Sequence, residues 1–170
     1  MPTEGSSAPW GPRTALRMSI RLIPFVGLAG TVVSTVIAAA SSDHDLTREL
    51  LLNSIFWMVG IQGWMTGFGH MFFGEPIAES IGWPAKTPWQ WEVGLASVAT
   101  GVLGVMVRSF SVDFWLATII AFSVFYLGAA VGHVKQMVVA RNFSPGNAGP
   151  IFFFDVIVPV YLIVVYAVAA

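Results

Sequence analysis

Long apolar runs alternate with short polar stretches along the 170 residues of the chain. Five runs can be distinguished, at about residues 20–40, 50–73, 90–107, 114–139 and 150–170. Each is close to the roughly 20 residues that a helix needs to cross a bilayer. Backbone groups in lipid must be paired within their own segment, and no alternating strand pattern is visible, so we expect helices. The predicted fold is all-α: a mobile cytoplasmic tail at 1–19, then one integral membrane helical bundle of five transmembrane helices at 20–170.

The composition agrees with a membrane protein. Hydrophobic residues make up 56% of the chain and charged residues 10%, whereas soluble domains carry about 25% charged residues. No block of like charge is present, and no nucleic-acid partner is predicted. The absence of cysteine excludes disulfides, thiolate metal sites and thiol catalysis. The predicted partner is the lipid bilayer, and a membrane-protein partner or a homo-oligomer remains open.

Basic residues predict the orientation of the bundle. If the N-terminus is cytoplasmic, six of the eight lie inside and two outside. The inside residues are Arg13, Arg17, Arg21, Lys86, Lys135 and Arg141, and the outside residues are Arg48 and Arg108. This bias predicts an inner-membrane protein with the N-terminus inside and the C-terminus outside. In an alternative interpretation the first helix is a secretory signal cleaved near Ala40, which would leave four helices in the same orientation.

A Gly-His pair ends at His70 and recurs at His133, 63 residues later. An acidic residue flanked by an aromatic residue and valine follows each histidine after 22 residues, Glu92 in the first case and Asp155 in the second. Each intervening loop has a proline shortly before the next helix. The spacing predicts an internal repeat of two related helical hairpins that run in the same direction across the membrane. Coincidence is the alternative, since identity elsewhere is poor.

This topology brings ionisable residues from four helices to one depth near the cytoplasmic face. The cluster is His70, Glu92, His133 and Asp155, with Glu75, Lys135, Gln136 and Asn142 nearby as secondary members. A charge at the bilayer centre is unfavourable by about 2.5–3.5 kcal/mol, which makes such residues candidates for a functional site. Ordinary interpretations compete: Glu92 could complement a helix dipole, and Lys135 could extend to the membrane interface.

Small residues and turn formers predict how the site is enclosed. Gly63 and Gly67, and likewise Gly128 and Gly132, have the four-residue spacing that lets helices approach closely in lipid. The segment 141–150, "RNFSPGNAGP", is rich in turn formers and could fold over the cytoplasmic mouth as a lid.

Several chemistries fit this cluster, and none has a specific motif. His70, His133 and Asp155 could hold a divalent metal ion, because imidazole and carboxylate ligands suit such ions. Two histidines on facing helices could ligate haem, although the C-x-x-C-H attachment motif is absent. A histidine–carboxylate relay could carry protons. Metalloprotease, nucleophile-elbow and phosphate-binding motifs are absent, which argues against an enzyme.

Two stretches carry a resemblance to a family. "GFGHMFFGEPIAESIGW" and "GHVKQM…NFSPGNAG" resemble segments of small multi-pass bacterial membrane proteins that are classed as a domain of unknown function. The likeness covers roughly Phe56 to Tyr166. It implies a bacterial inner-membrane protein and implies no substrate or catalytic residue.

We therefore expect a membrane protein that binds a small ligand, a metal ion or a proton at the His/carboxylate cluster, in transport or sensing. The first alternative is an accessory or structural subunit in which the cluster only pairs helices. A membrane-embedded enzyme is the third hypothesis.

Overall fold

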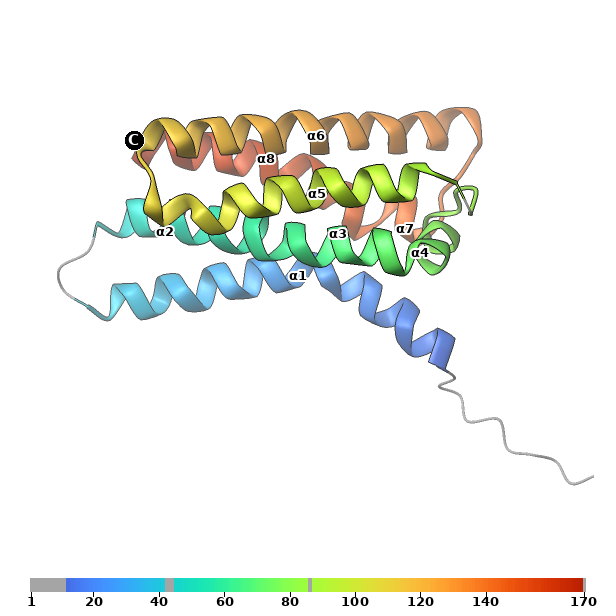
Figure 1. Ribbon diagram of the computed structural model, residues 1–170, viewed down its shortest axis with the longest axis horizontal. Helices are drawn as coiled ribbons and strands as arrows, with labels where there is room; N and C mark the ends of the chain where they lie inside the picture. Colours follow the sequence, from blue (N-terminus) through green and yellow to red (C-terminus); the bar gives the residue numbers. More distant parts are fainter. Residues whose placement is uncertain (1–11, 42–44, 86, 170) are drawn as a thin grey trace, which may run out of the picture.

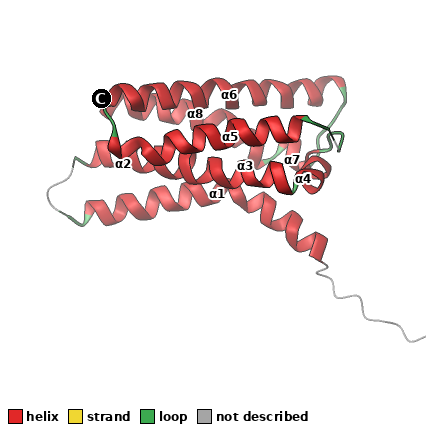
Figure 2. Cartoon of the chain, viewed as in Figure 1, coloured by secondary structure: helices red, strands yellow, loops and turns green. Residues whose placement is uncertain are grey.

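The computed structural model describes residues 12–41, 45–85 and 87–169, and these residues form helices and loops without strands (Figure 2). The helices are α1 (Pro12–Ala39), α2 (Leu46–Ser54), the π-helical η1 (Ile55–Ile61), α3 (Gln62–Phe72), α4 (Gly74–Ile81), α5 (Trp89–Met106), the 3₁₀ turn η2 (Val107–Ser109), α6 (Val112–Val139), α7 (Pro145–Ala148) and α8 (Pro150–Ala169). The prediction of an all-α fold is confirmed.

The long helices lie side by side and alternate in direction, while the short helices α4 and α7 gather at one end (Figure 1). Helices α2, η1 and α3 follow one another without a break, so residues 46–72 form one rod. The chain is thus α1 followed by two hairpins, each with a short helix in its connecting loop. The later helices begin and end within four residues of the predicted spans. Helix α1 begins at Pro12 rather than near residue 20, because proline suits a first helical position and residues 13–19 favour helix although they are not all apolar.

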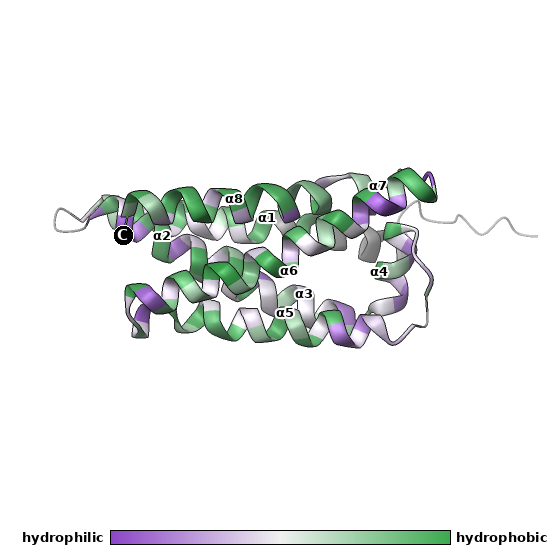
Figure 3. Cartoon of the chain, turned by 90° about the horizontal axis from the view of Figure 1, so that it is seen from above, coloured by the Kyte–Doolittle hydropathy of each residue, from purple (hydrophilic) through white to green (hydrophobic). Residues whose placement is uncertain are grey.

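Within the described residues, three helical segments are long and apolar enough to cross a membrane: Trp89–Ser109, Val112–Val139 and Pro145–Ala169. Hydrophilic colours concentrate toward the two ends of the bundle, and the lengths of the helices are mainly apolar (Figure 3). These features indicate a membrane protein. The apolar part of α1, Phe25–Ala39, is shorter, and the rod at 46–72 carries polar residues and a π-helical segment. The predicted count of five spans therefore stays a prediction.

Glycines hold α3 against α5 at backbone distance. A Cβ atom added to Gly63 would lie 2.9 Å from Cα of Gly101, and one added to Gly67 would lie 2.8 Å from the carbonyl oxygen of Gly94. A Cβ atom on Gly104 would collide with the backbone of Gly60 in η1. The prediction that Gly63 and Gly67 allow close helix approach is confirmed, since glycine permits contacts that larger residues would prevent.

The apolar core lies in the half of the bundle away from α4 and α7. It joins buried residues of the rod, of η2, of α6 and of α8: Leu51, Leu52, Ile55, Met58, Val59, Val107, Trp115, Ile119, Phe122, Tyr126, Val158 and Leu162. Helix α1 packs beside the rod, where the amide of Gly27 donates to Oε1 of Gln62 at 3.1 Å and the indole of Trp57 donates to Ser34 at 2.8 Å. The other half of the bundle is less densely filled.

The loop that was predicted as a lid, 141–150, contains α7 and packs on the C-terminal end of α4. The Asn142 amide donates to the carbonyl of Ile81 at 2.7 Å, and the Ser144 hydroxyl donates to the same oxygen at 2.8 Å. Gly146 lies so close to the backbone of Ser80 that an added Cβ would collide with it. Helices α4 and α7 together therefore close this end of the bundle.

Candidate functional site

A cavity of about 490 Å³ lies between α3, α5, α6 and α8 at the end closed by α4 and α7. Its walls are mainly apolar, and they include the rings of Trp83, Trp89, Phe125, Tyr126 and Phe154. The polar side chains on it come from four different helices: Gln62, Thr66, His70, Ser97, His133 and Asp155. This volume and this mixture of many apolar groups with few polar ones are typical of small-molecule sites.

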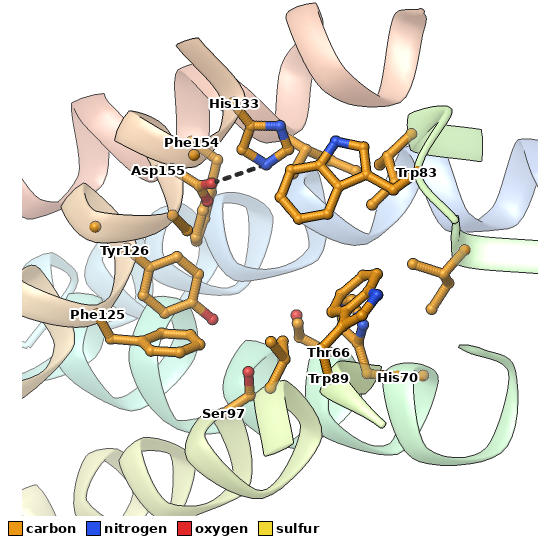
Figure 4. Close-up of a pocket in the computed structure, with 18 of the residues that line it drawn as sticks. Thr66, His70, Trp83, Trp89, Ser97, Phe125, Tyr126, His133, Phe154 and Asp155 are labelled. Atoms are coloured by element: carbon orange, nitrogen blue, oxygen red, sulfur yellow. Dashed lines mark ion pairs between the residues drawn. The ribbon is translucent and has the colours of Figure 1, made fainter. Parts of the chain in front are cut away.

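His133 and Asp155 form a buried pair on one wall of the cavity (Figure 4). Nε2 of the imidazole on α6 lies 3.6 Å from Oδ2 of the carboxyl on α8, and the two side chains are 7% and 5% exposed. Chain direction predicts this association from the sequence, and the structure brings the two residues together. Buried charges need a partner of this kind, since an isolated carboxylate in an apolar interior is strongly unfavourable.

Asn147 of α7 fixes the orientation of the His133 ring. The Asn147 amide nitrogen donates to two backbone carbonyls, of His133 at 3.2 Å and of Asn142 at 2.9 Å. The amide oxygen therefore faces Nε1 of Trp83 at 2.9 Å and Nδ1 of His133 at 2.8 Å. An amide oxygen only accepts, so Nδ1 of His133 must carry a proton. It follows that Nε2 is the titratable atom and that it points toward Asp155.

His70 has the same arrangement on the other side of the cavity. Its Nδ1 lies 2.7 Å from Oε1 of Gln90, and the Gln90 amide nitrogen donates to the carbonyl of Gly74 at 2.6 Å. Because that carbonyl takes the amide N–H, Oε1 is the atom that faces the imidazole and Nδ1 again donates. His70 also borders a second cavity of about 440 Å³, which Gln90 and Glu75 help to line. It therefore stands between the two cavities.

Two tryptophans lie between the histidines. The Trp89 ring is centred 5.7 Å from that of His70 and 5.3 Å from that of Trp83, whose ring is 5.4 Å from that of His133. These distances are within the range of favourable aromatic contacts. The indoles separate the imidazoles, so the two histidines contribute to different walls of one cavity.

The other predicted site residues lie away from the cavity. Glu92 is exposed in the first turn of α5, where it complements the helix dipole. Glu75 and Lys135 are exposed, and Gln136 is half-buried without lining the cavity. Asn142 binds the end of α4 as described above. The predicted four-residue cluster is therefore reduced to His70, His133 and Asp155, because Glu92 follows Gln90 by two residues and points to a different face of α5.

The proposed metal set of His70, His133 and Asp155 is not brought together as one ligand group. Among the described residues no three histidine, aspartate or glutamate side chains are grouped so that they could hold one metal ion. The physical reason is the tryptophan pair between the imidazoles. The haem hypothesis has no further observation in its favour.

Asn147, Gln90 and Trp83 also belong to the site, although they were not predicted as members from the sequence. Gln90 follows His70 by 20 residues, and Asn147 follows His133 by 14. These two spacings differ from each other and from the 22 residues that separate each histidine from its acidic residue. The predicted internal repeat therefore stays a prediction. Asn147 lies in the segment predicted as a lid that offers Asn side chains, which was the available signal. Gln90 lies in "TPWQW", two residues before Glu92, and no sequence pattern distinguishes it there.

Gly128 and Gly132 serve the cavity and not the packing of helices. No atom would lie within 4 Å of a Cβ added to Gly128, and one added to Gly132 would lie 3.6 Å from Trp83. Their predicted role in close helix approach is wrong, because α6 faces the cavity at these two positions. The small residues keep that space open.

A comparison with curated proteins and a comparison with solved structures gave no match. A family model matches residues 18–170, which is nearly the whole chain and includes every residue of the cavity. The resemblance described from the two glycine-rich stretches is thereby confirmed. The chain belongs to a family of unknown function, DUF6790.

Proposed function

We propose that this protein is a five-span inner-membrane protein that binds a small ligand from the bilayer in the cavity between α3, α5, α6 and α8, in a transport or sensing role. The N-terminus is cytoplasmic and the C-terminus is outside. The cavity then lies toward the cytoplasmic leaflet, behind the cover made by α4 and α7. No catalytic step is proposed.

The observation that carries this proposal is the buried His133–Asp155 pair on the wall of an apolar cavity of about 490 Å³. A pair that served only to join α6 and α8 could lie between the two helices without an adjoining space. Ionisable residues at membrane depth mark binding sites or ion pathways more often than simple packing.

The pair also indicates what kind of ligand would fit. With Nδ1 of His133 committed to Asn147, Nε2 and the Asp155 carboxyl can hold one proton between them. Either distribution of that proton leaves the pair with no net charge. A neutral ligand with a hydroxyl or carbonyl group can then bind there without introducing an unpaired charge, whereas an ion would have to lose its hydration in an apolar site.

Cavity occupancy can be tested by filling the space. Ala129 lines the cavity on α6, and Val131 two residues later is 69% exposed and does not line it. Native mass spectrometry of the protein, extracted from membranes in mild detergent, should reveal a small bound molecule in the wild type and in Val131→Phe. Ala129→Phe should lack it. Equal adducts in all three proteins would contradict the proposal.

The structural-subunit alternative is supported by the same pair, because His133 and Asp155 connect α6 with α8. Asp155→Asn separates the two roles, since it keeps the shape of the side chain and removes its charge. Under the proposed function the variant folds with near wild-type thermal stability and loses the bound molecule. A large loss of stability with an unchanged adduct would favour the structural role.

A further inference from the structure

The cavity has a second polar point, formed by hydroxyl groups far from the histidine–carboxyl pair in sequence. Ser97 of α5 is fully buried and Tyr126 of α6 is 5% exposed, and both line the cavity. In the described part of the chain neither hydroxyl makes a hydrogen bond of regular geometry, although the Ser97 and Thr66 hydroxyls lie near that of Tyr126. The hydroxyls of Tyr126, Ser97 and Thr66 point toward one another at the base of the cavity (Figure 4).

Unpaired hydroxyls are unusual in an interior, because a buried polar group without a partner is unfavourable. Two of them converging on one cavity wall from α5 and α6 indicate a place for an atom that the ligand supplies. A hydroxyl group can both donate and accept, so an oxygen atom of a carbonyl, hydroxyl or ether fits there.

The walls between the two polar points are aromatic. The Trp83 and Trp89 rings border one side, and Phe125, Tyr126 and Phe154 border another (Figure 4). The ring centroids of Tyr126 and Phe154 are 5.8 Å apart, and the two rings pack edge to face. Such surfaces favour a flat, unsaturated ring system, which gains stacked or edge-to-face contacts beyond simple burial.

Helices α5 and α6 diverge toward the α4 and α7 end of the bundle (Figure 3), and residues of both helices line the cavity. Val124 lines the cavity and is still 71% exposed, and Gly128 on the next turn has no neighbour near its Cβ position. This side of the cavity lies along an apolar helix face. An apolar chain attached to the ligand can therefore pass between α5 and α6 into surrounding lipid.

We infer that the ligand is a lipid-soluble ring compound with oxygen substituents, of the quinone or chromanol class. One oxygen binds the Tyr126 and Ser97 hydroxyls, another binds at His133–Asp155, the ring lies between the aromatic walls and the tail leaves between α5 and α6. This inference rests on the proposed function, and it adds the chemical class and the second anchoring point.

The test uses ubiquinone with a single isoprene unit as the ring probe and 1-dodecanol as a probe with a tail and a hydroxyl but no ring. Dissociation constants are measured from ligand-induced thermal stabilisation in detergent. The variants are Tyr126→Phe and Ser97→Ala, each of which removes one hydroxyl. Tyr161→Phe is the matched control, because its hydroxyl is paired with Ser54 at 2.8 Å outside the cavity.

The ring probe should bind the wild type, and each hydroxyl variant should weaken it by about three- to tenfold, as expected for one lost hydrogen bond. Tyr161→Phe and Val131→Phe should leave the affinity unchanged, and Ala129→Phe should abolish binding. If neither Tyr126→Phe nor Ser97→Ala changed the dissociation constant of the ring probe, the second anchoring point would be overturned.

The failures of the two proposals have different signatures. Stabilisation by dodecanol alone, lost in Ala129→Phe, would overturn the ring class and leave the proposed function intact. Stabilisation by neither probe would overturn the ring class, while adducts found by native mass spectrometry would still support a ligand in the cavity. Equal stabilisation of the wild type and Ala129→Phe by both probes would place binding outside the cavity and overturn both.

Discussion

Nε2 of His133 faces Oδ2 of Asp155 at 3.6 Å across the contact between α6 and α8, and the Asn147 amide on the far side of the ring determines which nitrogen faces the acid. The imidazole is thus hydrogen-bonded at Nδ1 and faces the carboxyl group with Nε2. Its orientation follows from the two carbonyls that bind the Asn147 amide nitrogen, and so ultimately from the fold of the loop at 141–150.

The first prediction concerns the energy of this pair. His133→Leu and Asp155→Leu should each lower the free energy of unfolding by about 3–5 kcal/mol, because each leaves a buried partner alone. The double variant should recover most of that loss, since an apolar pair can replace a buried ion pair, but it should bind no ligand. Denaturant unfolding in detergent gives the three free energies. A double variant as unstable as the sum of the single ones would show that the two side chains do not interact.

The second prediction is a tautomer. Both His70 and His133 should carry the proton on Nδ1 when neutral, because Gln90 and Asn147 each offer only an acceptor oxygen there. Nitrogen-15 NMR of histidine-labelled protein distinguishes the two tautomers, and His70→Gln and His133→Gln assign the signals. A protonated Nε2 with a bare Nδ1 at either residue would mean that the neighbouring amide is reversed.

The third prediction concerns the glycine contacts. Gly101→Val should destabilise the protein by about 1–3 kcal/mol, because its side chain would press on the backbone of Trp64 and Gly60. Gly128→Val is the matched control, and it should change stability by less than about 0.5 kcal/mol, since nothing lies near its Cβ position. Thermal unfolding of both variants decides the matter. Equal losses would argue against the close contact of α3 with α5.

The fourth prediction tests the number of spans and their orientation. The chain has no cysteine, so single cysteines can be introduced without background. Cysteines at Ser41 and Ser111 should react with a membrane-impermeant maleimide from outside, and those at Ala85 and Phe143 only after the membrane is opened. All four positions are exposed in the structure. Labelling of Ser41→Cys from the same side as Ala85→Cys would contradict five spans and favour the three that hydropathy supports.

The sequence was sufficient for the all-α fold, the extent of most helices and the meeting of His133 with Asp155. The helices follow from the length of the apolar runs, which is a local property of the sequence. The meeting of the two residues follows from chain direction, because successive helices run in opposite directions. His70 lines the same cavity as His133, in agreement with the expectation that helices of the same direction bring the two histidines to one end of the bundle.

The rest depended on rotation about helix axes, which run length does not define. Glu92 and Gln90 are two residues apart, yet only Gln90 reaches His70, and this depends on the face that α5 turns to α3 through its glycines. Gly63 precedes Gly67 by four residues, just as Gly128 precedes Gly132, but only Gly63 packs against another helix. The cavity is formed by several helices together, and no single segment of the sequence predicts it.

The π-helical segment at Ile55–Ile61 has a consequence for everything that follows it in the rod. A π turn holds one residue more than an α turn, and each residue in an α-helix advances the azimuth by about 100°. An uninterrupted α-helix would therefore present His70 and the glycine face at a different angle. Loss of one residue from this stretch would restore regular α-helical turns and rotate the imidazole away from Trp89. The π-helical segment thus sets the rotation of α3 relative to α2, and so it connects the well-packed half of the bundle with the half that holds the cavity.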